Sequence, residues 1–163
     1  GNYLLNVGPM ADGRMSPYSQ ALLAHTGAWF KLVKEAFCDV EPCSDLTQNG
    51  HILLTRKDNV VYVISHKPPV TTSVRLLPID AEPVSATLLN TGQKVDWVIN
   101  RVPGYGPGVD AEPYLRLLDI PVNPLAGQVI VIKLEFRAED ITSFTGGHQG
   151  TSTEREFSAD AYA

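Results

Sequence analysis

Carboxylates are the first residues to consider for chemistry, because the sequence holds 18 Asp and Glu residues. Two carboxylates that face each other can act as a nucleophile and a general acid. The acids between residues 39 and 82, however, fall in stretches with turn or linker composition, where solvated charge is the ordinary role. They are Asp39, Glu41, Asp45, Asp58, Asp80 and Glu82. We therefore predict no catalytic residue in this chain.

Two glycines, Gly8 and Gly13, have the spacing of a phosphate-binding loop. Such a loop needs Lys and then Ser or Thr directly after the second glycine, and here Arg14 and Met15 follow. The Lys charge and the hydroxyl that binds Mg²⁺ are therefore missing. We predict an exposed loop between a strand and a helix, with no bound phosphate.

A metal site and a serine-hydrolase triad have little support in the sequence. The four histidines are widely separated and lack metal-ligand spacing: His25, His51, His66 and His148. A Gly-x-Ser-x-Gly elbow is missing as well. Cys38 and Cys43 could form a local disulfide or remain two free thiols. We predict no metal site and no cofactor.

Three aromatic residues of the second half, Trp97, Tyr105 and Tyr114, could form a surface on which a sugar ring stacks. Aromatic residues on strands more often pack in a core or against a neighbouring strand. We favour core packing for these residues. A row of the three on the surface would instead favour sugar binding.

The formal net charge of −5 argues against nucleic acid as a partner, because phosphate binding needs a basic patch. No apolar run approaches the roughly 20 residues that span a bilayer, so no membrane partner is expected. The chain begins at Gly1 without an initiator Met or a signal-peptide pattern. A truncated start is therefore expected, and the compartment stays unknown.

The elements that position these residues fall into two parts. In the first part, Tyr3–Val7 is an apolar run typical of a strand buried on both faces. Ser16 and Pro17 then have the composition of a helix start, with Ser as N-cap and Pro in the first turn. Apolar side chains recur at helical spacing as far as Val33. Residues 1–37 are thus predicted to form one βα unit.

After a polar linker at 38–48, the hydrophobic period changes to two, which is typical of strands. The predicted strands are His51–Thr55, Asn59–Ser65, Ser73–Leu77, Val84–Leu89, Lys94–Val98, Tyr114–Leu118 and Gln128–Phe136. Seven short strands with turns between them predict an antiparallel β-sandwich over 49–136. Its buried positions are predicted to include Val61, Val63, Leu76 and Leu88. Residues 137–163 are predicted to be a flexible tail or the start of a further module.

The first 37 residues carry a resemblance to a known family. Gly-Asn-Tyr-Leu-Leu-Asn-Val-Gly-Pro at 1–9 and Ala-Asp-Gly-Arg-Met-Ser-Pro at 11–17 resemble the α-L-fucosidases of glycoside hydrolase family 29. Gly27, Trp29, Glu35 and Ala36 also match that pattern. The chain departs from it at 33–34, where Asn-Gly is common, and at 37–40, where an aromatic residue and Gly-Thr are usual.

The resemblance implies that 1–37 is the last strand and helix of a (β/α)8-type catalytic barrel, followed by the family's C-terminal sandwich. It implies a parent enzyme that removes α-linked L-fucose from glycans with retention, using two carboxylates from strands that precede Gly1. A fucosylated glycan is then the partner, reached through the missing barrel. Because barrel active sites lie at the carboxyl ends of the strands, Asn6 could reach the pocket floor. Its alternative role is to cap the turn at Gly8.

Two other readings follow from the same residues. The sandwich could be an autonomous carbohydrate-binding module, although such a module has no reason to retain half a barrel repeat. It could also be a structural module without a ligand. The strand and helix without their barrel would expose apolar side chains and an unpaired edge. We therefore expect residues 1–15 either to be the least protected ordered segment or to self-associate at high concentration.

Overall fold

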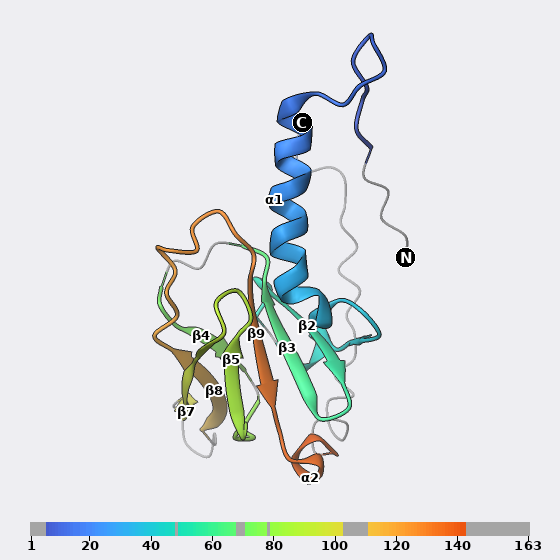
Figure 1. Cartoon of the computed structure of the whole chain (residues 1–163). Coiled ribbons are helices and arrows are strands. Elements are labelled where there is room, and N and C mark those ends of the chain that lie inside the picture. Colours follow the sequence, from blue (N-terminus) through green and yellow to red (C-terminus); the bar gives the residue numbers. More distant parts are fainter. Residues whose placement is uncertain (1–5, 48, 68–70, 78, 103–110, 143–163) are drawn as a thin grey trace, which may run out of the picture.

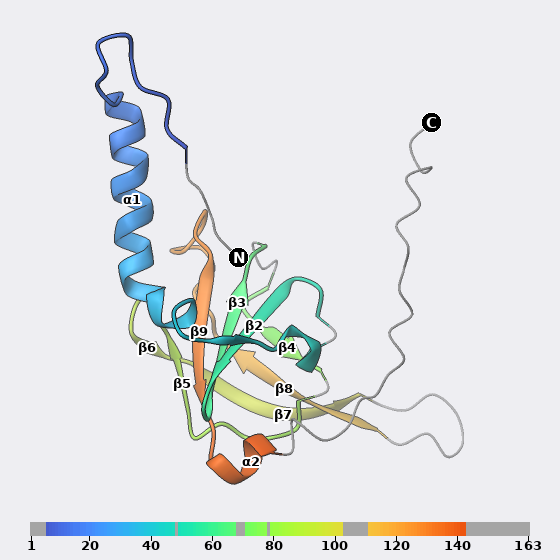
Figure 2. The same cartoon turned by 90° about the vertical axis from the view of Figure 1, so that its right-hand side faces the viewer.

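The computed structural model describes residues 6–47, 49–67, 71–77, 79–102 and 111–142. Two antiparallel sheets pack face to face, and a long helix stands on the larger sheet and extends away from it (Figures 1 and 2). The helix is α1, Pro17–Val33, followed by the short 3-10 helix η1, Lys34–Ala36. A short helix, α2, Ala138–Thr142, follows the last strand.

The larger sheet has six strands in the order β1-β2-β3-β9-β5-β6. Their bounds are β1 Glu41–Pro42, β2 Ile52–Lys57, β3 Val60–Ser65, β5 Ser85–Leu88, β6 Gln93–Lys94 and β9 Ile130–Glu135. The last strand in sequence, β9, inserts between β3 and β5 and pairs antiparallel with both. The 3-10 helix η2, Ser44–Leu46, connects β1 to β2.

The smaller sheet has three strands in the order β4-β8-β7. They are β4 Val74–Leu76, β7 Asp96–Val102 and β8 Glu112–Leu118. The central strand β8 pairs Leu115 with Leu76 on one side and with Ile99 on the other. These three side chains therefore lie on the same face of the sheet, because directly opposed residues of an antiparallel pair share a face.

The main core lies between the two sheets. Alternate residues of each strand point into it, as the two-residue period of a strand requires. Its fully buried members include Leu54, Val61, Val63, Leu76, Leu88, Leu115, Leu117, Ile132, Leu134 and Phe136. The prediction that Val61, Val63, Leu76 and Leu88 are buried is confirmed.

A second, smaller core lies on the opposite face of the six-stranded sheet, under the end of α1. It contains Val33, Ala36, Tyr62, Ile64 and Val131. Strands β3 and β9 are thus covered on both faces, the sandwich core on one side and the helix on the other. This double burial explains why five of the six residues of β3 are fully buried.

The antiparallel β-sandwich predicted from the sequence is confirmed. The predicted linker contains β1, and Cys43 within it belongs to the main core, so this segment contributes to the sandwich. Tyr3–Leu5 of the predicted first strand lie outside the described residues, and Asn6 and Val7 form no strand. The predicted tail contains α2, and its residues 143–163 also lie outside the described ranges. The division into domains stays a prediction.

Candidate functional site

The start of α1 is defined by local capping. The Ser16 hydroxyl accepts a hydrogen bond from the backbone N–H of Ser19 at 3.1 Å, and Pro17 occupies the first helical position. Ser and Pro are favoured there because they satisfy or avoid the unpaired N–H groups of a helix start. Before the cap, Gly13 has a φ of +77° and donates to the Met10 carbonyl at 2.9 Å, which closes a tight turn. The predicted helix start is confirmed.

The end of α1 is fixed to the outer face of β3 and β9. Val33 and Ala36 are completely buried there. The Trp29 indole donates a hydrogen bond from Nε1 to the Val129 carbonyl at 3.0 Å. The Thr55 hydroxyl donates to the Ala36 carbonyl at 2.7 Å, which connects the end of η1 to β2. The helix is therefore attached through its last turns by both apolar and polar contacts.

Asn90 supports the segment to which Trp29 is bonded. It is buried, donates from Nδ2 to the Val129 carbonyl at 3.0 Å, and accepts from the Val131 N–H at 2.9 Å. The Val129 carbonyl thus accepts from both Trp29 and Asn90. Because a carbonyl oxygen has two lone pairs, both bonds form at once, and the helix is linked to the turn after β5 through one atom.

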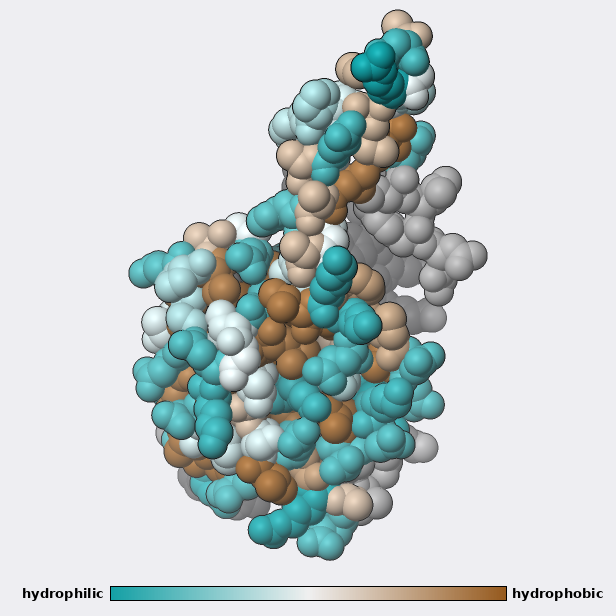
Figure 3. All heavy atoms as spheres, viewed as in Figure 1, coloured by the Kyte–Doolittle hydropathy of each residue, from teal (hydrophilic) through white to brown (hydrophobic). Residues whose placement is uncertain are grey.

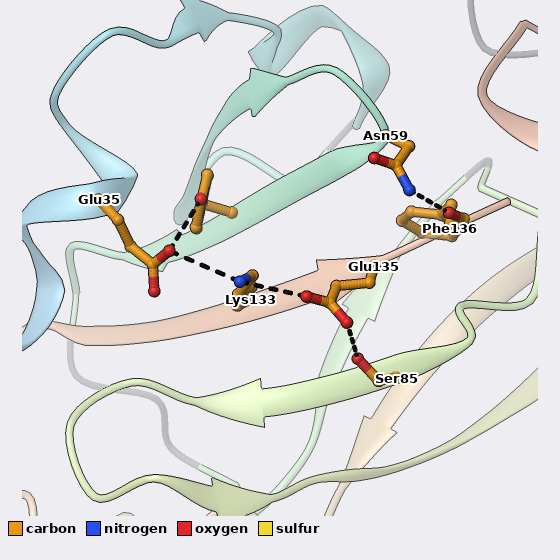
Figure 4. A network of polar contacts seen from close by, with 7 residues as sticks. Glu35, Asn59, Ser85, Lys133, Glu135 and Phe136 are labelled. Atoms are coloured by element: carbon orange, nitrogen blue, oxygen red, sulfur yellow. Dashed lines mark hydrogen bonds and ion pairs between the residues drawn. The ribbon is translucent and has the colours of Figure 1, made fainter. Parts of the chain in front are cut away.

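A polar network crosses the same face of the sheet beside the helix (Figure 4). Lys133 on β9 forms ion pairs with Glu35 of η1 at 3.6 Å and with Glu135 at 3.1 Å. Glu35 accepts from the Tyr62 hydroxyl at 3.2 Å, and Glu135 accepts from the Ser85 hydroxyl at 2.7 Å. The network joins η1, directly after α1, to β3, β9 and β5.

These contacts shift the proton affinities of the network. Hydrogen bonds from Ser85 and then Lys133 lower the pKa of Glu135, because both stabilise its charged form. The hydrogen bond with Glu135 raises the pKa of Lys133. Burial, followed by the nearby charge of Glu35, raises the pKa of Tyr62. The fully connected network therefore consists of charged Glu135, charged Lys133 and neutral Tyr62.

Acidification is expected to weaken this network. Because the folded-state pKa of Glu135 is lowered, its contribution to stability is present above the unfolded pKa of about 4.3 and is lost as the pH falls through the folded value. Glu135→Gln should be less stable than the parent at pH 7, by less than about 1 kcal/mol because the carboxylate is partly solvated. The difference should shrink towards pH 3.

Urea unfolding at several pH values measures this difference. Glu82→Gln removes an exposed acid from the loop before β5 and serves as the matched control. A Glu135→Gln deficit that stays constant from pH 7 to pH 3 would contradict the role given to the charged carboxylate.

The half of α1 that extends beyond the sheet keeps an apolar stripe. Tyr18, Leu22, Trp29 and Val33 recur at intervals of four, seven and four residues, so they share one side of the helix. Val33 is buried and Trp29 half-buried on the sheet, whereas Tyr18 is 79% and Leu22 is 53% exposed. The face that packs at one end of the helix is thus uncovered at the other end.

Exposed hydrophobic side chains are concentrated in this region. Ten large ones are exposed in the part of the chain that the structure describes, and seven of them lie between residues 10 and 37. They are Met10, Met15, Tyr18, Leu22, Phe30, Leu32 and Phe37. Figure 3 shows hydrophobic side chains along α1 and where the helix meets the sheet. We call residues 10–37 the docking segment, because a concentration of this kind marks an interaction surface.

Two of the predicted stacking residues, Trp97 and Tyr114, lie on opposite faces of the three-stranded sheet. Trp97 packs against the main core, because its register partner is the buried Leu117. Side chains alternate between the two faces along β8, and Leu115 and Leu117 point into the core. Tyr114 therefore lies on the opposite face of the same sheet. Trp97 and Tyr114 therefore cannot form one stacking row, and Tyr105 lies outside the described residues. Asn6 is exposed, and its contact with a substrate pocket stays a prediction.

Other candidates behave as ordinary structural groups. Cys38 and Cys43 form no disulfide with each other, and the first is exposed and the second buried. Within the described ranges, no three His, Cys, Asp or Glu residues are grouped so that they could hold a metal ion. No helix among the described residues has the length and apolarity to cross a membrane.

The residues of the helix–sheet junction were not identified as site residues from the sequence. Lys133 and Glu135 did carry a signal, since they interrupt an otherwise apolar strand at alternate positions. Such a pattern indicates that one face of the strand makes polar contacts. The partners Glu35, Tyr62 and Ser85 come from three distant segments, and only the folded sheet places them together.

Comparison with curated proteins finds two relatives, both α-L-fucosidases. The tissue α-L-fucosidase of Bos taurus is 31% identical over 101 residues, which is 61% of this chain and 22% of that protein. The α-L-fucosidase of Branchiostoma floridae is 28% identical over 101 residues, which is 60% of this chain and 22% of that protein. The chain thus spans about a fifth of the length of these relatives. No protein-family model matches it.

Solved structures show the same likeness at the level of the fold. The α-L-fucosidase from Vibrio sp. strain EJY3 has a TM-score of 0.63 at 23% identity, over 83% of this chain and 23% of that chain. A glycoside hydrolase family 29 α-L-fucosidase from Bacteroides thetaiotaomicron has a TM-score of 0.51 at 23% identity, over 80% and 27%. The resemblance noted in the sequence is confirmed, and its coverage is consistent with a C-terminal fragment.

Proposed function

We propose that this chain is the C-terminal part of an α-L-fucosidase and that its sandwich supports the catalytic barrel of the parent protein. The relatives named α-L-fucosidase support the parent's activity. Release of α-linked L-fucose from glycans is then the reaction of the parent. The catalytic carboxylates would lie upstream of Gly1, as the resemblance implies.

The observation that carries the support role is the half-covered stripe of α1. Its C-terminal end is anchored by Trp29, Val33 and the Lys133 network, while Tyr18 and Leu22 on the same side are exposed. A barrel that packs against the exposed half would bury those side chains, with about 1.5–3 kcal/mol gained for each large one that is fully covered. The anchored half of α1 would hold that barrel in a defined position relative to the sandwich.

The chain alone is expected to release no 4-nitrophenol from 4-nitrophenyl α-L-fucoside, because retaining hydrolysis needs two carboxylates, which this proposal assigns to the segment upstream of Gly1. The parent protein, expressed from the complete reading frame, is expected to release it. Direct measurement of the released 4-nitrophenolate by its absorbance compares the two at equal molar concentration.

A third sample separates the support role from the activity itself. In the parent protein, Trp29→Ala should lower the melting temperature of the barrel and leave the KM of any remaining activity nearly unchanged. Turnover by the purified isolated chain, or a parent protein inactive on every α-L-fucoside, would reject the proposal. A variant parent with unchanged barrel stability would reject the support role only.

A further inference from the structure

The outer face of the three-stranded sheet carries two arginines side by side. Val74, Leu76, Leu115 and Leu117 point into the main core. The alternate positions therefore face outward. Asp96 and Leu118 lie at one end of this face, and beside them lie five further residues: Arg75, Val98, Asn100, Tyr114 and Arg116. We call these five residues the basic face. Val98 is directly opposed to Arg116, and Asn100 to Tyr114.

Arg75 and Arg116 are directly opposed on the strands β4 and β8. Opposed residues of an antiparallel pair have Cβ atoms about 4.5–5.5 Å apart, where like charges destabilise the pairing. Neither guanidinium forms an ion pair with another described residue. Asp96 is exposed and lies on the same face, opposite Leu118 and two residues from Val98 along β7. Arg75 is exposed and Arg116 half-buried, so the two adjacent cations are accessible to an anion from solvent.

The Arg116 guanidinium also has an unsatisfied donor. Its Nη2 donates to the Ser73 hydroxyl at 3.2 Å. Its Nε is covered from solvent and has no acceptor, and within the described part of the chain it is the one buried side-chain N or O atom in this condition. Buried donors are paired in nearly all folded proteins, so such an atom calls for a specific explanation. A small shift of the guanidinium onto a bound oxyanion would give Nε and a terminal N–H two parallel bonds.

Tyr114 and Asn100 lie beside this cation pair. Tyr114 is two residues from Arg116 on β8, so their Cα atoms are about 7 Å apart and their side chains share a face. Both Tyr114 and Asn100 are half-buried, so their outer edges remain available. An aromatic ring offers a flat apolar surface, and an amide offers a donor and an acceptor. This combination suits a sugar ring whose acidic group is held by the arginines.

We propose that the basic face binds an acidic saccharide, with Arg75 and Arg116 on its sulfate or carboxylate group and Tyr114 against the sugar ring. The anion part of this inference stands on the arginine pair alone. The saccharide part rests on the proposed function, since it assumes that the parent protein acts on glycans. The site is separate from the docking segment, which lies on the far face of the six-stranded sheet.

Titration of the ¹⁵N-labelled chain, followed by amide chemical shifts, tests the proposal. The probes are glucose 6-sulfate, glucuronate, glucose and inorganic sulfate. Glucose 6-sulfate or glucuronate should shift the amides of β4, β7 and β8 saturably, and glucose should not. Which of the two binds more tightly distinguishes a sulfate from a carboxylate ligand. Added salt should weaken the binding.

Variants locate the site. Arg116→Gln and Arg75→Gln should each weaken binding about tenfold or more, because hydrogen bonds to a charged group are among the stronger ones. Arg116→Lys keeps the positive charge but loses the two parallel N–H donors of the guanidinium, and it should also weaken binding. Lys94→Gln removes an exposed cation from β6 of the other sheet and should change nothing. Dispersed amide spectra establish that each variant is folded.

Three results would each reject one part of the inference. Absence of saturable shifts with either acidic sugar rejects the site. Equal loss of binding in Lys94→Gln and Arg116→Gln rejects the arginine pair as its origin. Inorganic sulfate that binds as tightly as glucose 6-sulfate, unaffected by Tyr114→Ala, rejects the saccharide. Binding is measured without turnover, so an inactive parent protein would reject the proposed function and leave these results standing.

Discussion

Trp29→Ala is expected to release α1 from the sheet while the sandwich stays folded. The substitution removes the indole bond to the Val129 carbonyl and the edge contact with Phe37, whose ring centroid lies 5.9 Å away. A fully buried aromatic residue costs about 3–5 kcal/mol on truncation to Ala. Trp29 is half-buried, so we expect about 2–3 kcal/mol for the docking of the helix.

Hydrogen exchange resolves this effect by segment. Protection of the amides of α1 should fall about 30-fold or more, since each 1.4 kcal/mol is a factor of ten. The amides of β3, which pair with β2 and β9, should keep their protection. Local opening of one element without global unfolding is the expected behaviour of a unit attached at one end.

Two variants separate the causes. Trp29→Phe retains most of the ring packing and loses the N–H, and the Val129 carbonyl keeps its bond from Asn90. Its effect should therefore be small. Leu32→Ala shortens an exposed side chain of the same helix and should leave exchange unchanged. Equal deprotection of α1 and β3 in Trp29→Ala would show that helix and sandwich unfold together, against this account.

Leu117→Ala is expected to destabilise the whole sandwich. Leu117 is completely buried on β8 and packs in the core between the two sheets. Removing its side chain beyond Cβ leaves a cavity, and such changes cost about 2–5 kcal/mol. The midpoint of urea unfolding should fall accordingly, with the slope of the transition unchanged.

Leu53→Ala is the matched control, because it makes the same chemical change at a position that is 47% exposed on β2. Its cost should stay below about 1 kcal/mol, as for most surface substitutions. Equal losses at the two positions would mean that the space between the sheets is not the main core.

Much of the sandwich was predictable because its strands obey a local rule. Burial on one face imposes a period of two, and the buried Val61, Val63, Leu76 and Leu88 follow it. The start of α1 was also predictable, since the Ser16 cap and Pro17 act on neighbouring backbone groups. Each of these predictions depends on chemistry within a few residues.

Strand order could not be predicted in the same way. The last strand, β9, lies between β3 and β5, which are separated from it by about 70 and 46 residues along the chain. Its alternation shows that one face is more polar, but not what covers that face. The ion pairs from Lys133 to Glu35 and Glu135 depend on this placement.

The candidate surfaces show the same division. The residue pattern by itself predicts the helix and its apolar stripe, because spacing along the sequence defines which side chains share one side of a helix. Only the tertiary structure decides that Trp29 and Val33 are covered while Tyr18 and Leu22 are exposed. It also decides that Trp97 and Tyr114 face opposite ways, and that Arg75 and Arg116 are neighbours. The physical reason is that strand register, a property of distant pairing, brings together side chains that have no contact along the sequence.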